Sequence, residues 1–117
     1  MTATQKHEFS YKNLKTLPVG KMVKMGYATT ALWDGLIAAI YHHGNEIATL
    51  SKETIRITHH GYNSNTTRDR LDQVMTANYG TEMYRVNKHK GLISLMVNRT
   101  TTPVAFDTIT LQRTGVK

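Results

Sequence analysis

Residues 61–79 constrain the fold most, because they form the one stretch that predicts a complete helix with a marked beginning. Leu71, Val74 and Met75 recur at three and four positions and form a narrow apolar stripe that a sheet could cover. Thr67 and Asn78 fall on the same face of this helix. The sequence therefore predicts a single helix as the centre of one small core.

The start of this helix is predicted from its polar residues. Thr66 is followed three places later by Asp69, the spacing of a capping box in which each side chain accepts from a backbone amide of the first turn. Asn65 and Thr67 are alternative caps. Gly80 suits the left-handed backbone that commonly ends a helix.

Short strands are predicted on both sides of the helix. Their residues alternate between apolar and polar, or are apolar on both faces, and turn-forming residues separate them. The predicted strands are 36–41, 46–50, 54–58, 82–87, 92–97 and 108–112. Residues 19–25 could add another strand, although two glycines weaken it. The predicted fold class is α+β, a mainly antiparallel twisted sheet of about five to six strands with one helix packed on one face.

Positive charge is distributed unevenly along the chain. The net charge is +7, and residues 1–30 hold five lysines against Glu8, more than half of that surplus. Because residues 1–30 also carry weak secondary-structure signals, they are predicted to be a basic extension outside a domain formed by residues 31–117. A basic balance favours acidic or polyanionic partners, although it also simply keeps a small protein soluble. The chain has no cysteine, which excludes disulfides and thiolate chemistry.

The order of these segments resembles a family of small bacteriophage proteins. The resemblance rests on the hairpin at 41–48, the pair Gly61-Tyr62, the helix start at 65–72 and the pair Phe106-Asp107 before a last strand. It covers about residues 35–112 and leaves the basic N-terminal part unmatched. It implies a phage origin and an accessory role in the cytoplasm of an infected bacterium, and it transfers no catalytic residue.

Catalytic and metal chemistry find little support in the sequence. The doublets His42-His43 and His59-His60 invite a metal site, but neighbours on a strand point to opposite faces, so only histidines from different doublets could meet. Asp72 is expected to pair with Arg68 rather than to hold a metal. We therefore expect no enzyme activity, no metal and no cofactor, with a metal-dependent nuclease as the less favoured alternative.

Nucleic-acid binding has more support. Arg68 and Arg70 lie near the predicted helix start, where a cation opposes the helix dipole, and they could hold a phosphate together with the threonine hydroxyls. Basic side chains also project from the predicted strands. The candidate contact residues are Arg56, Thr66, Thr67, Arg68, Arg70, Arg85, Lys88 and Lys90.

A protein partner is the alternative from a different class. Exposed methionines among lysines would suit an adaptable interface with an acidic host protein or with a nucleic-acid-containing host complex, as in an anti-defence, anti-CRISPR-like inhibitor. The candidate residues are Lys21, Met22, Lys24, Met25 and Tyr27. A minor virion component is a further alternative.

Overall fold

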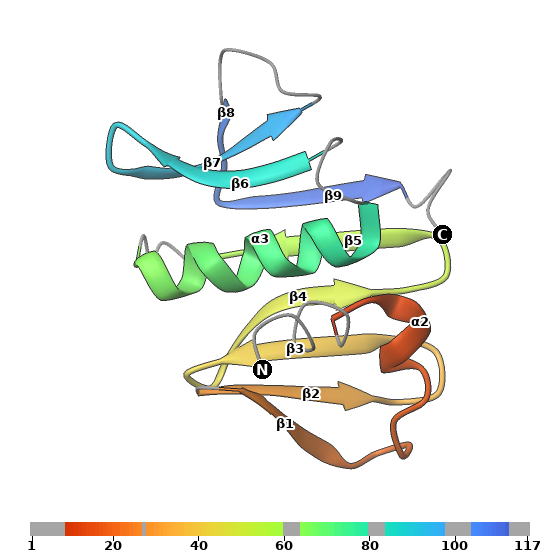
Figure 1. Cartoon of the computed structure of the whole chain (residues 1–117). Coiled ribbons are helices and arrows are strands. Elements are labelled where there is room, and N and C mark those ends of the chain that lie inside the picture. The colour runs from red at the N-terminus through yellow and green to blue at the C-terminus, as the bar shows by residue number, and fades with distance from the viewer. Residues whose placement is uncertain (1–8, 27, 60–63, 80–83, 98–103, 113–117) are drawn as a thin grey trace.

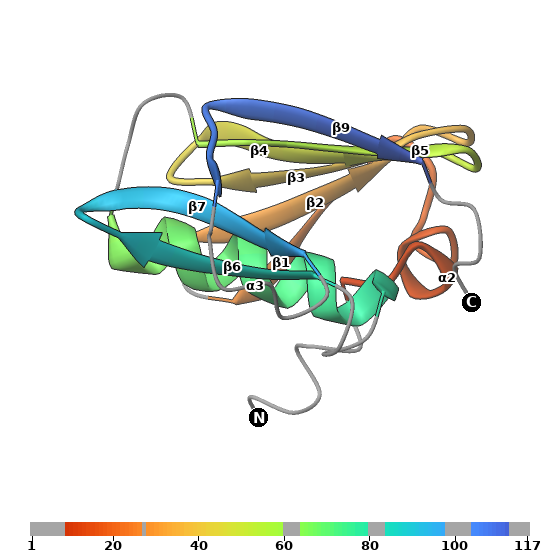
Figure 2. The same ribbon diagram turned by 90° about the horizontal axis from the view of Figure 1, so that it is seen from above.

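A six-stranded sheet forms one layer of the molecule, and helix α3 lies across one of its faces (Figures 1 and 2). The computed structural model describes residues 9–26, 28–59, 64–79, 84–97 and 104–112. The helices are α2 (Tyr11–Leu14) and α3 (Asn65–Tyr79). The strands are β1 (Met22–Gly26), β2 (Thr29–Trp33), β3 (Ala38–His42), β4 (Asn45–Leu50), β5 (Thr54–Thr58), β6 (Tyr84–His89), β7 (Leu92–Val97), β8 (Val104–Ala105) and β9 (Thr108–Gln112).

The sheet is antiparallel throughout, with the strand order β1-β2-β3-β4-β5-β9. Strands β1 to β5 follow one another as a meander, and β9 returns from the C-terminal part of the chain to pair with β5. The segment between β5 and β9 contains α3 and a second, three-stranded sheet of order β6-β7-β8. The predicted α+β class and the antiparallel sheet are confirmed, whereas the second sheet was not predicted.

The core lies between the six-stranded sheet and α3. Leu71, Val74 and Met75 are fully buried, so the predicted apolar stripe is confirmed. Ile55 and Ile57 of β5 are also fully buried, because alternate residues of a strand point to the same face. Burying each such side chain favours folding by about 1.5–3 kcal/mol.

The N-terminal segment differs from the predicted basic extension. Phe9 and Leu14 are fully buried in the core, and β1 pairs with β2 in the sheet. Asn78 of α3 ties this segment down: its side-chain oxygen accepts from the Tyr11 amide at 2.8 Å, and its side-chain nitrogen donates to the Phe9 carbonyl at 3.0 Å. Residues 9–26 are therefore part of the folded layers, and residues 1–8 lie outside the described part of the chain.

Two hairpins have tight turns with left-handed backbone. His43 and Gly44 connect β3 to β4 with φ of 52° and 80°, and Lys90 and Gly91 connect β6 to β7 with φ of 54° and 80°. Two consecutive residues of positive φ are typical of the turn that matches the twist of antiparallel strands. Both hairpins were predicted, with turns one to two residues longer.

Strand β3 begins two residues later than predicted because the Asp34 side chain binds the backbone of the first two residues of the predicted strand. The Asp34 carboxylate accepts from the amides of Ile37 at 2.7 Å and Leu36 at 2.8 Å, and these bonds lower the pKa of Asp34. Leu36 and Ile37 are consequently exposed, at 77% and 42%. Five strands rather than three precede α3, because β1 was only an option and β2 was missed.

Candidate functional site

Helix α3 begins with a serine cap that the sequence did not single out. The Ser64 hydroxyl accepts from the Thr67 amide at 3.2 Å and donates to the Thr67 hydroxyl at 2.8 Å. The Ser64 carbonyl accepts the first helical hydrogen bond, from the Arg68 amide. The predicted capping box of Thr66 and Asp69 is therefore wrong, because the cap is Ser64, two residues before Thr66, and Asp69 pairs with Arg68 instead.

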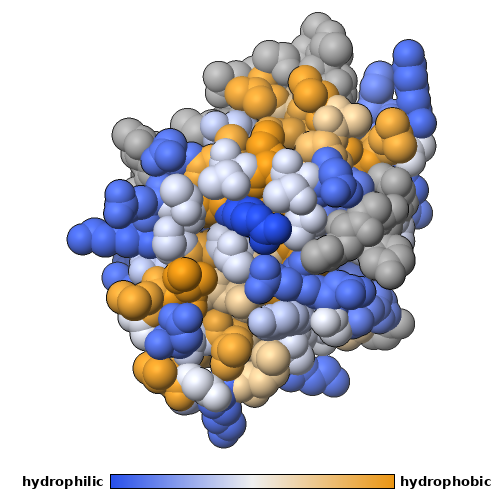
Figure 3. Space-filling view, turned by 180° about the vertical axis from the view of Figure 1, so that it is seen from behind, coloured by the Kyte–Doolittle hydropathy of each residue, from blue (hydrophilic) through white to orange (hydrophobic). Residues whose placement is uncertain are grey.

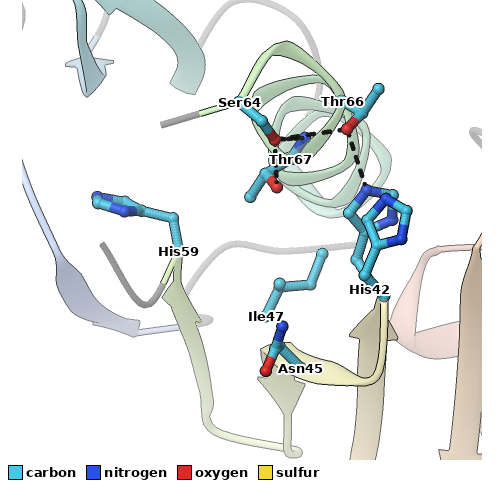
Figure 4. Close-up of a pocket in the computed structure, with 8 residues that line it drawn as sticks. His42, Asn45, Ile47, His59, Ser64, Thr66 and Thr67 are labelled. Carbon is cyan, nitrogen blue, oxygen red and sulfur yellow. Dashed lines mark hydrogen bonds between the residues drawn. The ribbon is translucent and has the colours of Figure 1, made fainter. Parts of the chain in front are cut away.

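This helix start lines a cavity of about 390 Å³. The cavity lies between the first turn of α3 and the ends of strands β3, β4 and β5 (Figure 4). Its described lining consists of His42, His43, Asn45, Ile47, His59, Ser64, Thr66 and Thr67. Buried Ile47 supplies an apolar floor, while the hydroxyls and imidazoles supply polar groups around it.

His42 is held in this wall by a chain of hydrogen bonds. Its Nδ1 lies 3.0 Å from the Thr29 hydroxyl and its Nε2 lies 3.2 Å from the Thr66 hydroxyl. Arg70 Nε donates to the same Thr29 oxygen at 2.9 Å. Since arginine can only donate, the Thr29 oxygen accepts from Arg70. This favours a Thr29 hydroxyl that donates to His42 Nδ1. The ring proton of His42 then lies on Nε2, which donates to the Thr66 hydroxyl.

Burial lowers the pKa of His42, and the nearby His43 and Arg70 lower it further. Each of these causes disfavours the imidazolium form. The His42 ring is therefore neutral at physiological pH, and it contributes a dipole rather than a positive charge to the cavity.

His59 serves a different role from His42. In Figure 4 its ring points away from His42 and from the start of α3. Its Nε2 is hydrogen-bonded to the Phe106 carbonyl, and its backbone amide donates to the Asp107 carbonyl at 3.2 Å. Its Nδ1 is buried without a hydrogen-bond partner and lies 3.8 Å from the Asp107 carboxylate. His59 thus fastens the connection between β8 and β9 to the end of β5.

The histidine doublets do not form a chelate in the described structure. The His42 and His43 rings lie edge to face with centroids 4.3 Å apart, which packs them together rather than aiming their nitrogens at one point. Within residues 9–26, 28–59, 64–79, 84–97 and 104–112, no group of three or more His, Asp or Glu side chains could hold a metal ion. His60 lies outside these ranges.

The arginines predicted to bind nucleic acid are engaged within the protein. Arg85 forms a two-pronged ion pair with Asp72 at 3.0 and 2.9 Å, and hydrogen bonding to that carboxylate raises the pKa of Arg85. Asp72 also accepts from the Val86 amide at 2.8 Å, so it joins α3 to β6, and the expected pairing of Asp72 with Arg68 is wrong.

The other arginines that were predicted to bind nucleic acid have partners too. Arg56 lies 3.4 Å from Glu46 on the face of the sheet opposite α3, and Arg70 donates to Gln73 as well as to Thr29. None of these arginines is placed as a free phosphate clamp.

The lysines of the β6–β7 hairpin are placed differently. Lys88 and Lys90 are exposed at the tip of this hairpin, and neither forms an ion pair with a described residue. Figures 1 and 2 both place this tip at the same end of the molecule as the start of α3 and the β3–β4 turn. We call this region the basic end, defined by His42, His43, Thr66, Lys88 and Lys90.

The residues predicted for a protein partner separate in the structure. Lys21, Met22 and Lys24 are exposed on or beside β1, whereas Met25 is only 5% exposed and belongs to the core. Its place in a partner-binding surface was therefore wrong, because alternation along β1 turns Met25 inward. Tyr27 lies outside the described residues.

The face of the sheet opposite α3 is open and mostly uncharged. Its outward positions on β4, β5 and β9 include Thr49, Thr54 and Thr110 around the Arg56–Glu46 ion pair. Figure 3 shows this face, with near-white side chains around a blue centre and orange, apolar side chains in separate groups above it and at the lower left. On these strands the Arg56 charge is balanced by Glu46, and the named threonines beside the pair are neutral.

These observations define a small α+β protein built on an open antiparallel sheet, with a cavity at the start of its main helix. The chain belongs to the family described as Kyanoviridae Gp96 protein, whose model matches residues 10–111. The phage family expected from the sequence is thus confirmed, and the match extends into the N-terminal segment that the resemblance had left out. No curated protein and no solved structure matches the chain. Neither described helix has the length and apolar character needed to cross a membrane.

Proposed function

We propose that this protein binds nucleic acid through the basic end, as an accessory protein acting in the cytoplasm of the infected bacterium. The observation that carries the proposal is the position of Lys88 and Lys90, two exposed lysines at a tight hairpin tip beside the start of a fifteen-residue helix. Lysines without a competing carboxylate can neutralise phosphates and release their counterions.

The groups at the start of α3 also favour the basic end as the surface that contacts nucleic acid. The first amides of a helix have no partner within the helix, and the helix dipole places partial positive charge there. The exposed Thr66 residue adds a hydroxyl donor of the kind that contacts phosphate oxygens. Lysines, this hydroxyl and helix amides together offer a surface complementary to a nucleic-acid backbone.

We favour binding over catalysis because of where the carboxylates lie. Nucleases that use two metal ions need carboxylates that converge on one site. Glu46 of β4 and Asp69 and Asp72 of α3 instead each pair with a different arginine. These pairings leave the three carboxylates with structural roles.

Salt dependence of binding tests the proposal. Fluorescence anisotropy with a labelled 20-nucleotide single strand and its duplex should give affinities that fall steeply with KCl concentration. The double variant Lys88→Ala and Lys90→Ala should reduce the slope by up to about two phosphate contacts. The matched control is Lys12→Ala with Lys15→Ala, which removes the same charge from α2 at the opposite end (Figures 1 and 2).

Three results would refute parts of this reasoning. A flat salt response of the wild-type protein would exclude phosphate binding, and a slope that changes only in the α2 control would place the contact surface elsewhere. Cleavage of the same oligonucleotides that depends on a divalent ion and is abolished by a chelator would establish an enzyme instead.

A protein partner is the second candidate, favoured by the apolar exposure around β1. Val19 and Met22 are 67% and 49% exposed beside Lys21 and Lys24. Exposed apolar side chains among lysines suit an acidic protein surface. A partner recovered from bacterial lysate after nuclease treatment, and lost with Met22→Ala while every lysine is kept, would favour this candidate.

A further inference from the structure

We infer that the cavity at the start of α3 receives an unpaired nucleobase, so that the protein prefers single-stranded nucleic acid. This inference rests on the proposed function, since it assigns the base-binding part of the same basic end. The exposed lysines would contact the backbone, and the cavity would hold one base.

The size of the cavity favours a base over a phosphate. Its volume of about 390 Å³ lies in the range typical of small-molecule sites, about 300–1,000 Å³. A phosphate held at a helix start needs amides in close contact around it rather than a wide hollow. A planar heterocycle uses the apolar floor at Ile47, which is 2% exposed, as well as the polar rim.

The charge of the cavity points the same way. Its described lining contains no Asp, Glu, Lys or Arg, and the pKa of His42 is lowered by burial and by two neighbouring basic groups. A neutral site offers little to an isolated anion and suits an uncharged ring with hydrogen-bonding edges. The separation of a neutral cavity from the exposed lysines matches the separation of base and phosphate in a nucleotide.

The rim carries the groups needed to hold a base. The Asn45 side chain supplies both a donor and an acceptor, and Figure 4 shows it directed toward Ile47 at the cavity. The exposed His43 ring beside it offers a planar surface for stacking. In a duplex the base edges and faces are already paired and stacked, so only an unpaired base can enter.

Two substitutions at Asn45 test the inference. Asn45→Leu removes the amide at similar volume, and Asn45→Trp places a bulky ring at the cavity. Asn45 is exposed at the first position of β4, so both variants should fold, which thermal unfolding checks. The matched control is Gln112→Leu, which removes a side-chain amide from an exposed position on β9.

The wild-type protein should bind a 20-nucleotide single strand about tenfold more tightly than the blunt duplex of the same sequence, as expected for stacking of one base. Asn45→Trp should abolish this preference without changing duplex affinity or the salt slope, and Asn45→Leu should reduce it. Equal affinity of the wild-type protein for both forms, or a preference that survives Asn45→Trp, would overturn the inference while leaving salt-dependent binding intact. Absence of salt-dependent binding to either form would overturn the proposed function itself.

Discussion

Asn78→Ala should destabilise the fold strongly, because one side chain joins α3 to the N-terminal segment. Asn78 is 4% exposed, accepts from the Tyr11 amide and donates to the Phe9 carbonyl. Its third bond, to the Val74 carbonyl, is local to the helix. Truncation leaves the Tyr11 amide and the Phe9 carbonyl without this partner, and a buried polar group left unsatisfied costs about 1–3 kcal/mol.

Two such losses amount to about 2–6 kcal/mol, with the lower part of this range reached if water can reach the half-buried Tyr11. Because domains are stable by only about 5–15 kcal/mol, urea unfolding should resolve the change easily. The control is Thr76→Ala on the same helix, where the hydroxyl donates to the Gln73 carbonyl at 3.3 Å, within its own turn. A free energy of unfolding for Asn78→Ala that stays within about 0.5 kcal/mol of wild type, the range of ordinary surface substitutions, would refute this account of the N-terminal anchor.

Two further predictions concern the core and the cavity wall. Leu71→Ala should lower the free energy of unfolding by about 2–5 kcal/mol because that side chain is fully buried, and denaturation within a few tenths of wild type would contradict the packing of α3. The pKa of His42 in the folded state lies below its ordinary value of 6.5, so the unfolded state binds more protons at this residue. The contribution of a neutral His42 to the free energy of unfolding is therefore complete above pH 6.5 and decreases as the pH falls below that value. His42→Gln should therefore flatten the decline of melting temperature between pH 7 and pH 5, and an unchanged pH dependence would contradict a neutral His42.

The elements that the sequence predicts well are those whose signal is local. Strand β5 was predicted at Thr54–Thr58, its observed bounds, because its alternation is unbroken. The buried residues of α3 follow the helical period, and both Thr67 and Asn78 lie on that predicted face. In each case a periodic pattern reports which side of the element is buried.

The elements that were missed depend on contacts between distant residues. The short helix α2 contributes Leu14 to the core because Asn78, far along the chain, holds the preceding backbone. In the second sheet β7 pairs with β8, and the two residues of β8 carry no clear strand pattern in the sequence. Local patterns contain no information about such pairings, so these residues were taken for a separate extension or left without structure.

The candidate site was predicted only in part. Thr66 and Thr67 do line the cavity, and Lys88 and Lys90 are exposed, but the arginines are paired. The role of His42 was missed because its partners Thr29 and Thr66 lie 13 and 24 residues away. The doublet His42-His43 was the one available signal, and it was considered for metal binding instead.

The late return of β9 to the sheet has a consequence for synthesis of the chain. Thr108 of β9 bonds to Thr58 of β5 across 50 residues, so the last strand of the sheet can pair only after α3 and the second sheet have been made. Until then β5 presents an unpaired edge, and unpaired edges are templates for association with other chains. At about 5–20 residues per second, this interval lasts several seconds on the ribosome. The meander of β1 to β5 is thus made several seconds before β9 can protect its edge from association with other chains.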